Sequence, residues 1–389
     1  MPRPIATFMR TAFVAAILLA AFAGCSDQDP IDTPPPDTKS LWTVRANGGG
    51  DFTDLQEGIN AAGDGDTVIV GPGRYATIGQ RIVGGIPRVY ALHIGASTRS
   101  NAKSLTIRSE AGPDSTIIGD ETIVDFAVVL QNTPGVTIEG FEIRGGGNRG
   151  VFLYRADATL TRNRITGSTF AVRAEESEIT LRSNHIIENQ TGLEANASTI
   201  TTIENLFDEN TSDGIVLISA TTATLRGDTI RASGATGIVL ALSGATVERA
   251  LISHSAGPAC DLTDSRLSIR ESTLVSNGRP AIGAFRDAIS VTGVSSVLNA
   301  ERVIIAYSGG CAVRNRQGAV TLSCCDLWEN LGGDGGADCS APGTNGTFAI
   351  NPSFCNLDTR DYSLRADSPC ASENSGACGL VGAFPVRCE

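Results

Sequence analysis

Hydrophobic and polar residues alternate along the chain in a phrase that returns many times between Gly150 and Leu327. The phrase is an aliphatic residue, Thr or Ser, a second aliphatic residue and, soon after, a polar or small residue followed by one more aliphatic residue. Its polar or small position recurs with a spacing of 21 to 23 residues, at Asn163, Asn184, Asn205, Asp228, Ala250 and Ser272. A Gly or Ala stands 13 or 14 residues before each of these positions, at Gly150, Ala171, Gly192, Gly214, Gly237 and Ala259. The constant spacing predicts that each period is one turn of a repeat protein.

The residues that fill each period decide between the repeat folds. Val, Ile and Thr alternate in short runs that are separated by Gly, Asn and Ser, which predicts short strands and tight turns. A leucine-rich repeat would need more leucine and a helical half, so we predict an all-β fold, a right-handed parallel β-helix of roughly 10–11 coils. Inward aliphatic side chains would stack in columns, each contributing roughly 1.5–3 kcal/mol on burial. We expect Asn163, Asn184 and Asn205 to bond the backbone of the next coil, which is a structural role.

The stretch 41–75 predicts how the first coil is closed. A strand pattern at 42–44 is followed by a helical pattern of apolar residues, which starts after a predicted N-cap at Thr53 and ends before Gly63. The open end of a parallel solenoid exposes apolar side chains and unpaired backbone. We therefore expect this helix to lie across the end of the solenoid as a cap.

The same opening carries a family resemblance. Its phrases Gly50-Asp51-Phe52-Thr53, Gly65-Asp66-Thr67-Val68 and Gly71-Pro72-Gly73 are similar to the opening of pectin-lyase-like proteins, which include the pectin methylesterases. Further phrases at 105–113 and 135–143 resemble the repeat of the carbohydrate-binding and sugar-hydrolase domains. The resemblance covers Trp42 to about Trp328. It implies a capped β-helix over residues 41–328 and a carbohydrate as the expected ligand.

The first forty residues have the pattern of an export signal and a tether. In residues 1–24, basic residues precede an apolar run that is too short to span a bilayer, as in a signal peptide. The phrase Phe22-Ala-Gly-Cys25 resembles the bacterial lipobox, whose cysteine is lipidated; because Phe22 replaces the usual Leu, cleavage without lipidation is the alternative. Residues 25–40 are polar and Pro-rich, which predicts an extended tether. We expect an exported protein, lipid-anchored to a membrane of the bacterial cell envelope through Cys25 (periplasmic or on the outer surface), or secreted if Cys25 carries no lipid.

Cysteines crowd the last eighty residues. In an exported protein an even set of eight predicts disulfides of undetermined connectivity, here among Cys311, Cys324, Cys325, Cys339, Cys355, Cys370, Cys378 and Cys388. A metal cluster at the adjacent Cys324 and Cys325 is the alternative. Cys260 falls at an inward position, so we expect a buried free thiol there. Residues 329–389 resemble the closing segments of secreted bacterial β-helix proteins and are predicted to form a Cys-rich cap.

Strand alternation places a polar and aromatic set on the outer face of three consecutive coils. The predicted outward pairs are Phe152 and Tyr154, Arg173 and Glu175, and Glu194 and Asn196. Aromatic rings can stack on sugars while charged groups bond sugar hydroxyls, so these six residues are the candidate glycan-binding site. The alternative is an ordinary solvated face that is held together by an ion pair between Arg173 and Glu194.

Two features beside this set extend the prediction. The same face turns apolar over the next two coils, at Val216, Ile218, Val239 and Ala241, and we expect a loop, the C-terminal segment or a partner protein to cover it. The segments 78–104 and 281–305 are longer than one coil, and we expect them to form loops that wall a groove.

Candidate chemistry is sparse. Glu175 and Glu194, with Arg173, could form the acid and base pair of a polysaccharide lyase or glycoside hydrolase. Asp125 is the nearest match to a catalytic aspartate of the pectin methylesterases, but the arginine and glutamine phrases that accompany it in those enzymes are missing. The three histidines never fall at ligand spacing, so we expect no metal and no cofactor.

These observations predict an exported protein that binds a glycan without catalysis. The net charge of −12 argues against nucleic acid as a partner. A lyase or hydrolase that acts on an acidic or plain polysaccharide is one alternative. A structural spacer of the cell envelope, or a solenoid that binds another protein, is the other.

Overall fold

The computed structural model describes residues 40–83, 86–96, 98–120, 125–145, 147–279, 284, 286–332, 339 and 345–389. All of them belong to one compact unit, Ser40–Glu389. The predicted signal peptide, the tether and Cys25 lie outside the described residues and stay predictions.

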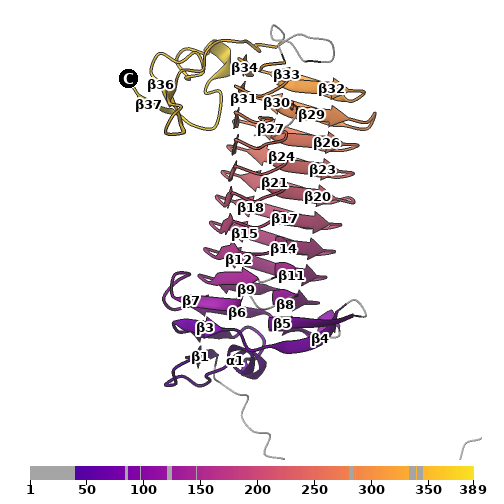
Figure 1. The fold of residues 1–389 in the computed structure, drawn as a ribbon, viewed down its shortest axis with the longest axis vertical. Helices are drawn as coiled ribbons and strands as arrows, with labels where there is room; N and C mark the ends of the chain where they lie inside the picture. Colours follow the sequence, from indigo (N-terminus) through magenta and orange to yellow (C-terminus); the bar gives the residue numbers. More distant parts are fainter. Residues whose placement is uncertain are drawn as a thin grey trace, which may run out of the picture. The chain divides into compact units, whose positions relative to one another are not determined.

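The unit is a stack of coils whose strands form three long sheets (Figure 1). Sheet A has twelve strands, in the order β1 (Leu41–Val44), β2 (Thr67–Val70), β6 (Leu105–Ser109), β9 (Val136–Glu139), β12 (Asp157–Thr161), β15 (Glu178–Arg182), β18 (Thr199–Ile203), β21 (Thr222–Arg226), β24 (Gly244–Glu248), β27 (Arg266–Arg270), β30 (Val297–Glu301) and β33 (Ala319–Ser323). Sheet B has eleven strands, in the order β3 (Gly73–Tyr75), β7 (Thr116–Asp120), β10 (Glu142–Gly145), β13 (Arg164–Thr166), β16 (His185–Ile187), β19 (Leu206–Asp208), β22 (Thr229–Arg231), β25 (Leu251–Ser253), β28 (Thr273–Val275), β31 (Ile304–Ala306) and β34 (Asp326–Trp328).

Sheet C also has eleven strands, in the order β4 (Gly79–Val83), β5 (Ile86–Gly95), β8 (Phe126–Gln131), β11 (Arg149–Tyr154), β14 (Phe170–Glu175), β17 (Thr191–Asn196), β20 (Ile215–Ile218), β23 (Ile238–Ala241), β26 (Cys260–Thr263), β29 (Ile289–Thr292) and β32 (Val313–Arg316). All pairings in the three sheets are parallel except β4 with β5. The predicted all-β parallel solenoid is therefore confirmed. The sheets contain eleven or twelve strands each, close to the roughly 10–11 coils predicted.

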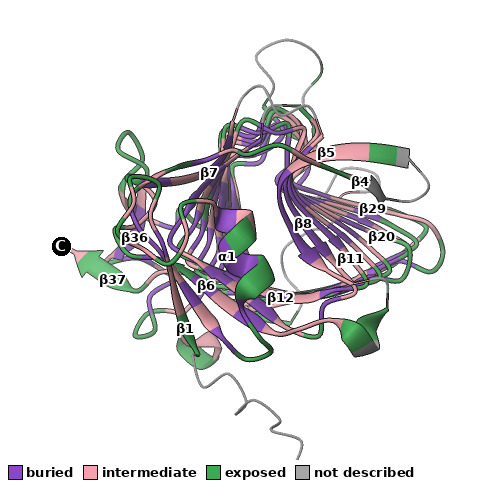
Figure 2. Cartoon of the chain, turned by 90° about the horizontal axis from the view of Figure 1, so that it is seen from below, coloured by how far each residue is buried: buried purple, intermediate pink, exposed green. Residues whose placement is uncertain are grey.

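Aliphatic side chains fill the interior. In the view along the coils, the buried residues are coloured purple on the strands that surround it (Figure 2). One inward column of sheet A contains Ile138, Leu160, Leu181, Thr202 and Leu225, which face one another in register from coil to coil. Cys260 is fully buried in the same core as a free thiol, as predicted.

Three ladders of polar side chains run inside the corners between the sheets. In the predicted ladder, the Oδ1 atoms of Asn184 and Asn205 accept bonds of 2.9 Å from the backbone N–H groups of Asn163 and Asn184. Asp228 continues the ladder by accepting from the N–H of Asn205 at 2.8 Å. Two further ladders were not predicted: one contains Asn189, Asn210, Asn277 and Asn330, and the other contains Ser177, Ser198, Thr221, Ser265 and Ser296. They satisfy backbone donors that the turns would otherwise bury without partners.

The N-terminal end is closed by α1 (Leu55–Ala61), whose Leu55 and Ile59 pack into the solenoid core. The N-cap is Asp54, which accepts from the N–H of Glu57, and not Thr53 as predicted. Asp can accept the orphan N–H bonds of the first turn as well as Thr, so the sequence alone does not separate the two positions.

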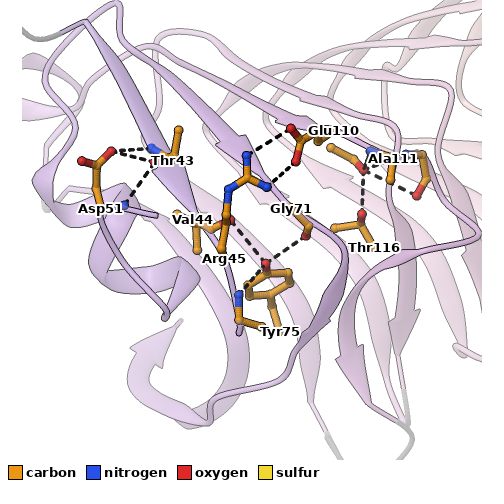
Figure 3. Close-up of polar contacts among 12 residues, drawn as sticks. Thr43, Val44, Arg45, Asp51, Gly71, Tyr75, Glu110, Ala111 and Thr116 are labelled. Carbon is orange, nitrogen blue, oxygen red and sulfur yellow. Dashed lines mark hydrogen bonds and ion pairs between the residues drawn. The ribbon is translucent and has the colours of Figure 1, made fainter. Parts of the chain in front are cut away.

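The residues of the family-like opening have structural partners (Figure 3). Asp51 accepts bonds from both the N–H and the hydroxyl of Thr43, which closes the Gly-rich turn between β1 and α1. The hydroxyl of Tyr75 donates to the carbonyl of Gly71 at 2.9 Å, and Arg45 pairs with Glu110. The close-up thus places these residues in the cap and the first coils, where they hold the turn and the strand ends.

The two predicted excursions have different outcomes. In segment 78–104, β4 and β5 form an antiparallel hairpin, followed by the 3-10 turn η1 (Arg99–Asn101). Figure 2 shows that β5 and β4 extend outside the outline of sheet C. The second prediction is wrong for most of 281–305, because Ile289–Thr292, Val297–Glu301 and Ile304–Ala306 are regular strands. What made this period long is the stretch before β29, part of which lies outside the described residues.

The C-terminal segment closes the far end and packs on sheet B. Residues 345–350 extend the last coil: the carbonyl of Phe348 accepts from the N–H of Leu327, and its N–H donates to the carbonyl of Cys325. Beyond them, β35 (Phe354–Asn356), β36 (Asp361–Arg365) and β37 (Val386–Cys388) form a small fourth sheet with η2 (Gly376–Cys378) nearby. Aromatic and aliphatic residues of this segment bury the outer side of β28, β31 and β34.

Three disulfides hold this end together, Cys311–Cys339, Cys324–Cys378 and Cys355–Cys388. The prediction that all eight cysteines pair is wrong for Cys325 and Cys370, which are buried free thiols. Cys325 points into the solenoid core as its neighbour Cys324 points outward, and Cys370 Sγ lies 3.2 Å from the Asp326 carboxylate. Within the described residues, no helix has the length and apolarity needed to cross a membrane.

Candidate ligand-binding site

The strands of sheet C place more side chains outward than simple alternation predicts. In β14, for example, Ala171 and Val172 both belong to the core, so Phe170 as well as Arg173 and Glu175 faces outward. The register aligns these positions across coils in three outer columns: Phe126, Arg149, Phe170 and Thr191; Val129, Phe152, Arg173 and Glu194; Gln131, Tyr154, Glu175 and Asn196. All six predicted site residues therefore share one face of three adjacent coils.

Two phenylalanines and an arginine form the floor of this face. The rings of Phe126 and Phe152 stack with centroids 5.2 Å apart, and Val129 joins them in a cluster outside the main core. The guanidinium carbon of Arg149 lies 4.6 Å from the centroid of Phe152 and 5.2 Å from that of Phe126. Phe152 is only 4% exposed, which contradicts its predicted role as a surface on which a sugar stacks. Its ring supports Arg149 instead.

Accessible rings flank the floor on two sides. Phe170, which the sequence analysis missed, is half-buried and lies under the guanidinium of Arg173 at 5.0 Å. Tyr154 is half-buried on the other side, where Arg155 lies 5.0 Å from its ring. A sugar could therefore stack on these two rings, although it could not stack on Phe152.

Arg173 is the centre of the charged part of the site. Its Nε donates to Glu175 Oε1 at 2.9 Å and its Nη1 to Glu194 Oε1 at 2.9 Å. The predicted ion pair with Glu194 is therefore present, although it lies on a face with buried aromatic rings and not on an ordinary solvated one. Asn196 completes the set as a half-buried neighbour of Glu175.

The β4–β5 hairpin is fastened beside this face. Arg88 pairs with Asp125 at 2.9 Å, and the other carboxylate oxygen of Asp125 accepts from the N–H of Val89 at 2.9 Å. Asp125, the weak match to an esterase aspartate, thus has its carboxylate committed to the hairpin. Tyr90 of the hairpin packs against the Phe126 and Phe152 cluster.

Arg149 differs from the other arginines of the described chain. Among the other arginines whose side-chain exposure is described, the half-buried ones have carboxylate partners, and those without partners are exposed to solvent. Arg149 is half-buried, forms no ion pair with any described residue, and its Nε is buried without a hydrogen-bond partner. Burial, together with the nearby Arg173, lowers the pKa of Arg149, but an arginine stays charged at neutral pH. Within the part of the chain that the structure describes, its charge therefore has no direct counter-ion.

The apolar part of sheet C lies next to this site. Val216 and Val239 continue the column of Glu194, and Ile218 and Ala241 continue that of Asn196. These side chains are half-buried, and the C-terminal segment, one of the predicted covers, packs on sheet B instead.

Other parts of the described chain offer less chemistry. A hollow of about 450 Å³ follows the outer side of sheet A and is lined mainly by Thr201, Thr224 and Thr246 and their neighbours. No group of three or more His, Cys, Asp or Glu residues in the described ranges could hold a metal ion. His93, His185 and His254 lie on different strands or turns, as their spacing predicted.

The sequence comparison identifies the family. The sequence model described as "Right handed beta helix region" matches residues 111–274 and 150–327, which together make up more than half of the chain. The chain belongs to this family. No curated protein matches the chain in sequence.

Two solved structures resemble this β-helix. One, described as "pectate lyase Pel9A", has a TM-score of 0.59 and 12% identity over 90% of this chain and 97% of its own. The other, described as "Agl-KA catalytic domain", has a TM-score of 0.53 and 12% identity over 70% of this chain and 55% of its own. At such identity these similarities establish the β-helix fold, and function has to be argued from the site.

Proposed function

We propose that this β-helix protein binds a glycan with an anionic substituent on the outer face of sheet C, without catalysis. The observation that carries the proposal is Arg149, a half-buried guanidinium that has no counter-ion among the described residues and lies on the Phe126 and Phe152 rings. A buried charge is stable only when it is paired or well hydrogen-bonded, so a ligand carboxylate, sulfate or phosphate would complete this site.

The groups around Arg149 suit the rest of a sugar. The half-buried rings of Tyr154 and Phe170 can pack on the C–H groups of a pyranose, and each lies within one coil of Arg149. Asn196 and the carboxylates of Glu175 and Glu194 can bond sugar hydroxyls. The site therefore combines one charged contact with stacking and hydroxyl contacts.

The arrangement of Glu175 and Glu194 argues against glycoside hydrolysis. A glycosidase needs one carboxyl group that is protonated and one that is ionised. Here Arg173 bonds both carboxylates, so the two groups share one charged partner and neither is set apart as the acid. The pectate lyase that shares this fold supports an acidic glycan as ligand by fold-level analogy alone.

We also propose that residues 1–24 direct export and that Cys25 is lipidated at the cell envelope. The three disulfides support export, because disulfides form and persist in oxidising compartments.

The test is a binding titration with oligosaccharides that differ only in charge, such as oligogalacturonates and their methyl esters. We expect the acid to bind and Arg149→Gln to weaken its binding by roughly tenfold or more, as loss of a charge-assisted bond implies. Tyr154→Ala should weaken the binding of the acid and of the methyl ester to a similar extent. Glu209→Gln, an exposed carboxylate away from the site, is the matched control for a surface charge change.

Product analysis by mass spectrometry separates binding from catalysis. Intact saccharide after long incubation is the expected result, whereas unsaturated or shortened products lost with Glu194→Gln would replace the proposal with an enzyme. No binding to any member of a wide glycan panel would leave the envelope spacer or a protein partner.

A further inference from the structure

The outer face of sheet C changes character one coil beyond the charged part of the site. Glu194 is in register with Val216 and then Val239, while Asn196 is in register with Ile218 and then Ala241. Each step along these columns is about 4.8 Å, the spacing of neighbouring strands. A ligand that lies along the solenoid axis would therefore pass directly from polar contacts to aliphatic ones.

The apolar surface also reaches round the corner toward sheet A. Leu242 follows Ala241 and is 64% exposed, although it is a large hydrophobic residue. With Ala220 of the preceding coil, Leu242 lines a separate hollow of about 410 Å³, whose other lining residues are mostly polar. The four aliphatic residues of sheet C, namely Val216, Ile218, Val239 and Ala241, lie outside this hollow and form the apolar strip.

The apolar strip has a polar boundary at both ends. Glu194 and Asn196 precede it, and Asp261 and Thr263 occupy the same two columns in the coil that follows. Within the described chain, neither hydrophobic cluster outside the solenoid core includes any of its residues. A patch of two coils between polar borders fits a small hydrocarbon group better than an extended protein interface.

We propose that the ligand is an amphiphilic glycoconjugate, whose saccharide occupies the charged part of the site and whose alkyl or acyl group lies on Val216, Ile218, Val239 and Ala241. This inference rests on the proposed glycan function and names the class of ligand more closely. Each methylene that leaves water on this apolar strip raises the affinity by up to about fourfold.

The test uses methyl, butyl and octyl β-D-glucuronide in calorimetric titrations with the protein, the octyl compound below its micelle concentration. The expected result is that affinity rises from methyl to butyl to octyl. In the double variant Val216→Thr/Val239→Thr the gain of the octyl compound should fall by about tenfold, while methyl glucuronide binds as before. Thr fits these half-exposed strand positions, and thermal melting checks that the variant is folded. Val386→Thr, at another exposed valine, is the matched control.

Several results would overturn the inference, and they differ from failure of the proposed function. Equal affinity for the methyl and octyl compounds would leave glycan binding intact and remove the alkyl subsite. If the affinity gain of the octyl compound persists in the double variant, the octyl group binds elsewhere on the protein. Binding of none of the glucuronides would overturn both proposals. A self-association in sedimentation analysis that the double variant abolishes would make the apolar strip a protein interface instead.

Discussion

Asp228 is the place where the repeat holds an ionisable group inside its polar ladder. Burial raises the pKa of Asp228 from 3.8 to about 6, although bonds from Thr202 and Asn205 oppose this shift. The Asp228 carboxylate accepts from the Thr202 hydroxyl at 2.6 Å and from the Asn205 side chain at 2.9 Å. The perturbation we consider is Asp228→Asn, which restores the residue that the ladder holds at the three preceding coils.

The expected magnitude follows from linkage. Because the folded-state pKa is raised, the folded protein binds a proton that the unfolded chain has released between pH 3.8 and about 6. The stabilisation that Asp228 contributes is complete below its unfolded pKa and is lost as pH rises through its folded pKa. The pKa difference corresponds to about 3 kcal/mol. An Asn does not titrate, so the variant should gain stability relative to the native protein by up to about 3 kcal/mol as pH rises from 4 to 7.

The assay is chemical unfolding followed by circular dichroism at several values between pH 4 and 7.5, with the difference between variant and native protein as the measured quantity. Other titrating groups contribute to both proteins and cancel in this difference. Asp358→Asn, at an exposed turn residue, controls for the loss of one negative charge. A stability difference between Asp228→Asn and the native protein that does not change with pH would refute the reasoning. The variant keeps its bonds because Asn can donate to the Thr202 hydroxyl, which can act as an acceptor.

Three further outcomes follow from the described contacts. Asn184→Ala should destabilise the protein by about 2–3 kcal/mol in urea unfolding, because the N–H of Asn163 loses its buried acceptor. Replacing Cys324 and Cys378 by Ser removes a crosslink with a sequence separation of 54, worth about 4 kcal/mol by the chain-entropy relation; limited proteolysis should then cleave residues 345–389 first. Arg88→Ala should speed hydrogen exchange in β5 without changing exchange in β24, because it removes the side-chain ion pair and leaves only the bond from the Val89 N–H to hold the hairpin to Asp125.

The sequence predicts the interior of this fold well because each coil must repeat the same inward residues. A side chain that stacks on its counterpart one coil away, such as Leu181 on Leu160, needs an aliphatic neighbour in both directions. The repeat period can therefore be recognised in the amino-acid sequence. The two missed ladders illustrate the limit: Ser177 and Ser198 resemble ordinary turn residues, and only the backbone path turns them inward.

The disulfide prediction failed for a related reason. Counting cysteines cannot separate Cys325 from Cys324, although the first points into the core and the second is crosslinked outside it. The alternation of inward and outward positions along the strand contained the information needed to separate them. Residues 320 and 322 belong to the aliphatic phrase, and one further inward position at Cys325 continues its pattern across the turn.

Alternation correctly placed Arg173, Glu194 and Tyr154 on the outer face of sheet C, and their role in binding stays a prediction. Arg149 and Phe170 were missed because Gly or Ala and the following residue both turn inward, which moves the residue before them to the outer face. That signal is available in the sequence: each outward residue stands directly before the recurring Gly or Ala. The burial of Phe152 could not be inferred, because it depends on the side chain of Arg149 from the same strand.

The contrast between two outer columns is the strongest reason to place function on sheet C. On sheet A, the outward column reads Thr at seven successive coils, namely Thr106, Thr137, Thr159, Thr180, Thr201, Thr224 and Thr246. Strand propensity alone explains that uniformity. On sheet C, one column changes from Phe152 to Arg173, Glu194 and Val216 in consecutive coils. Neither the packing of the core nor the polar ladders require this order of side chains in the outer column. A ligand whose chemistry changes along its length explains the order more simply.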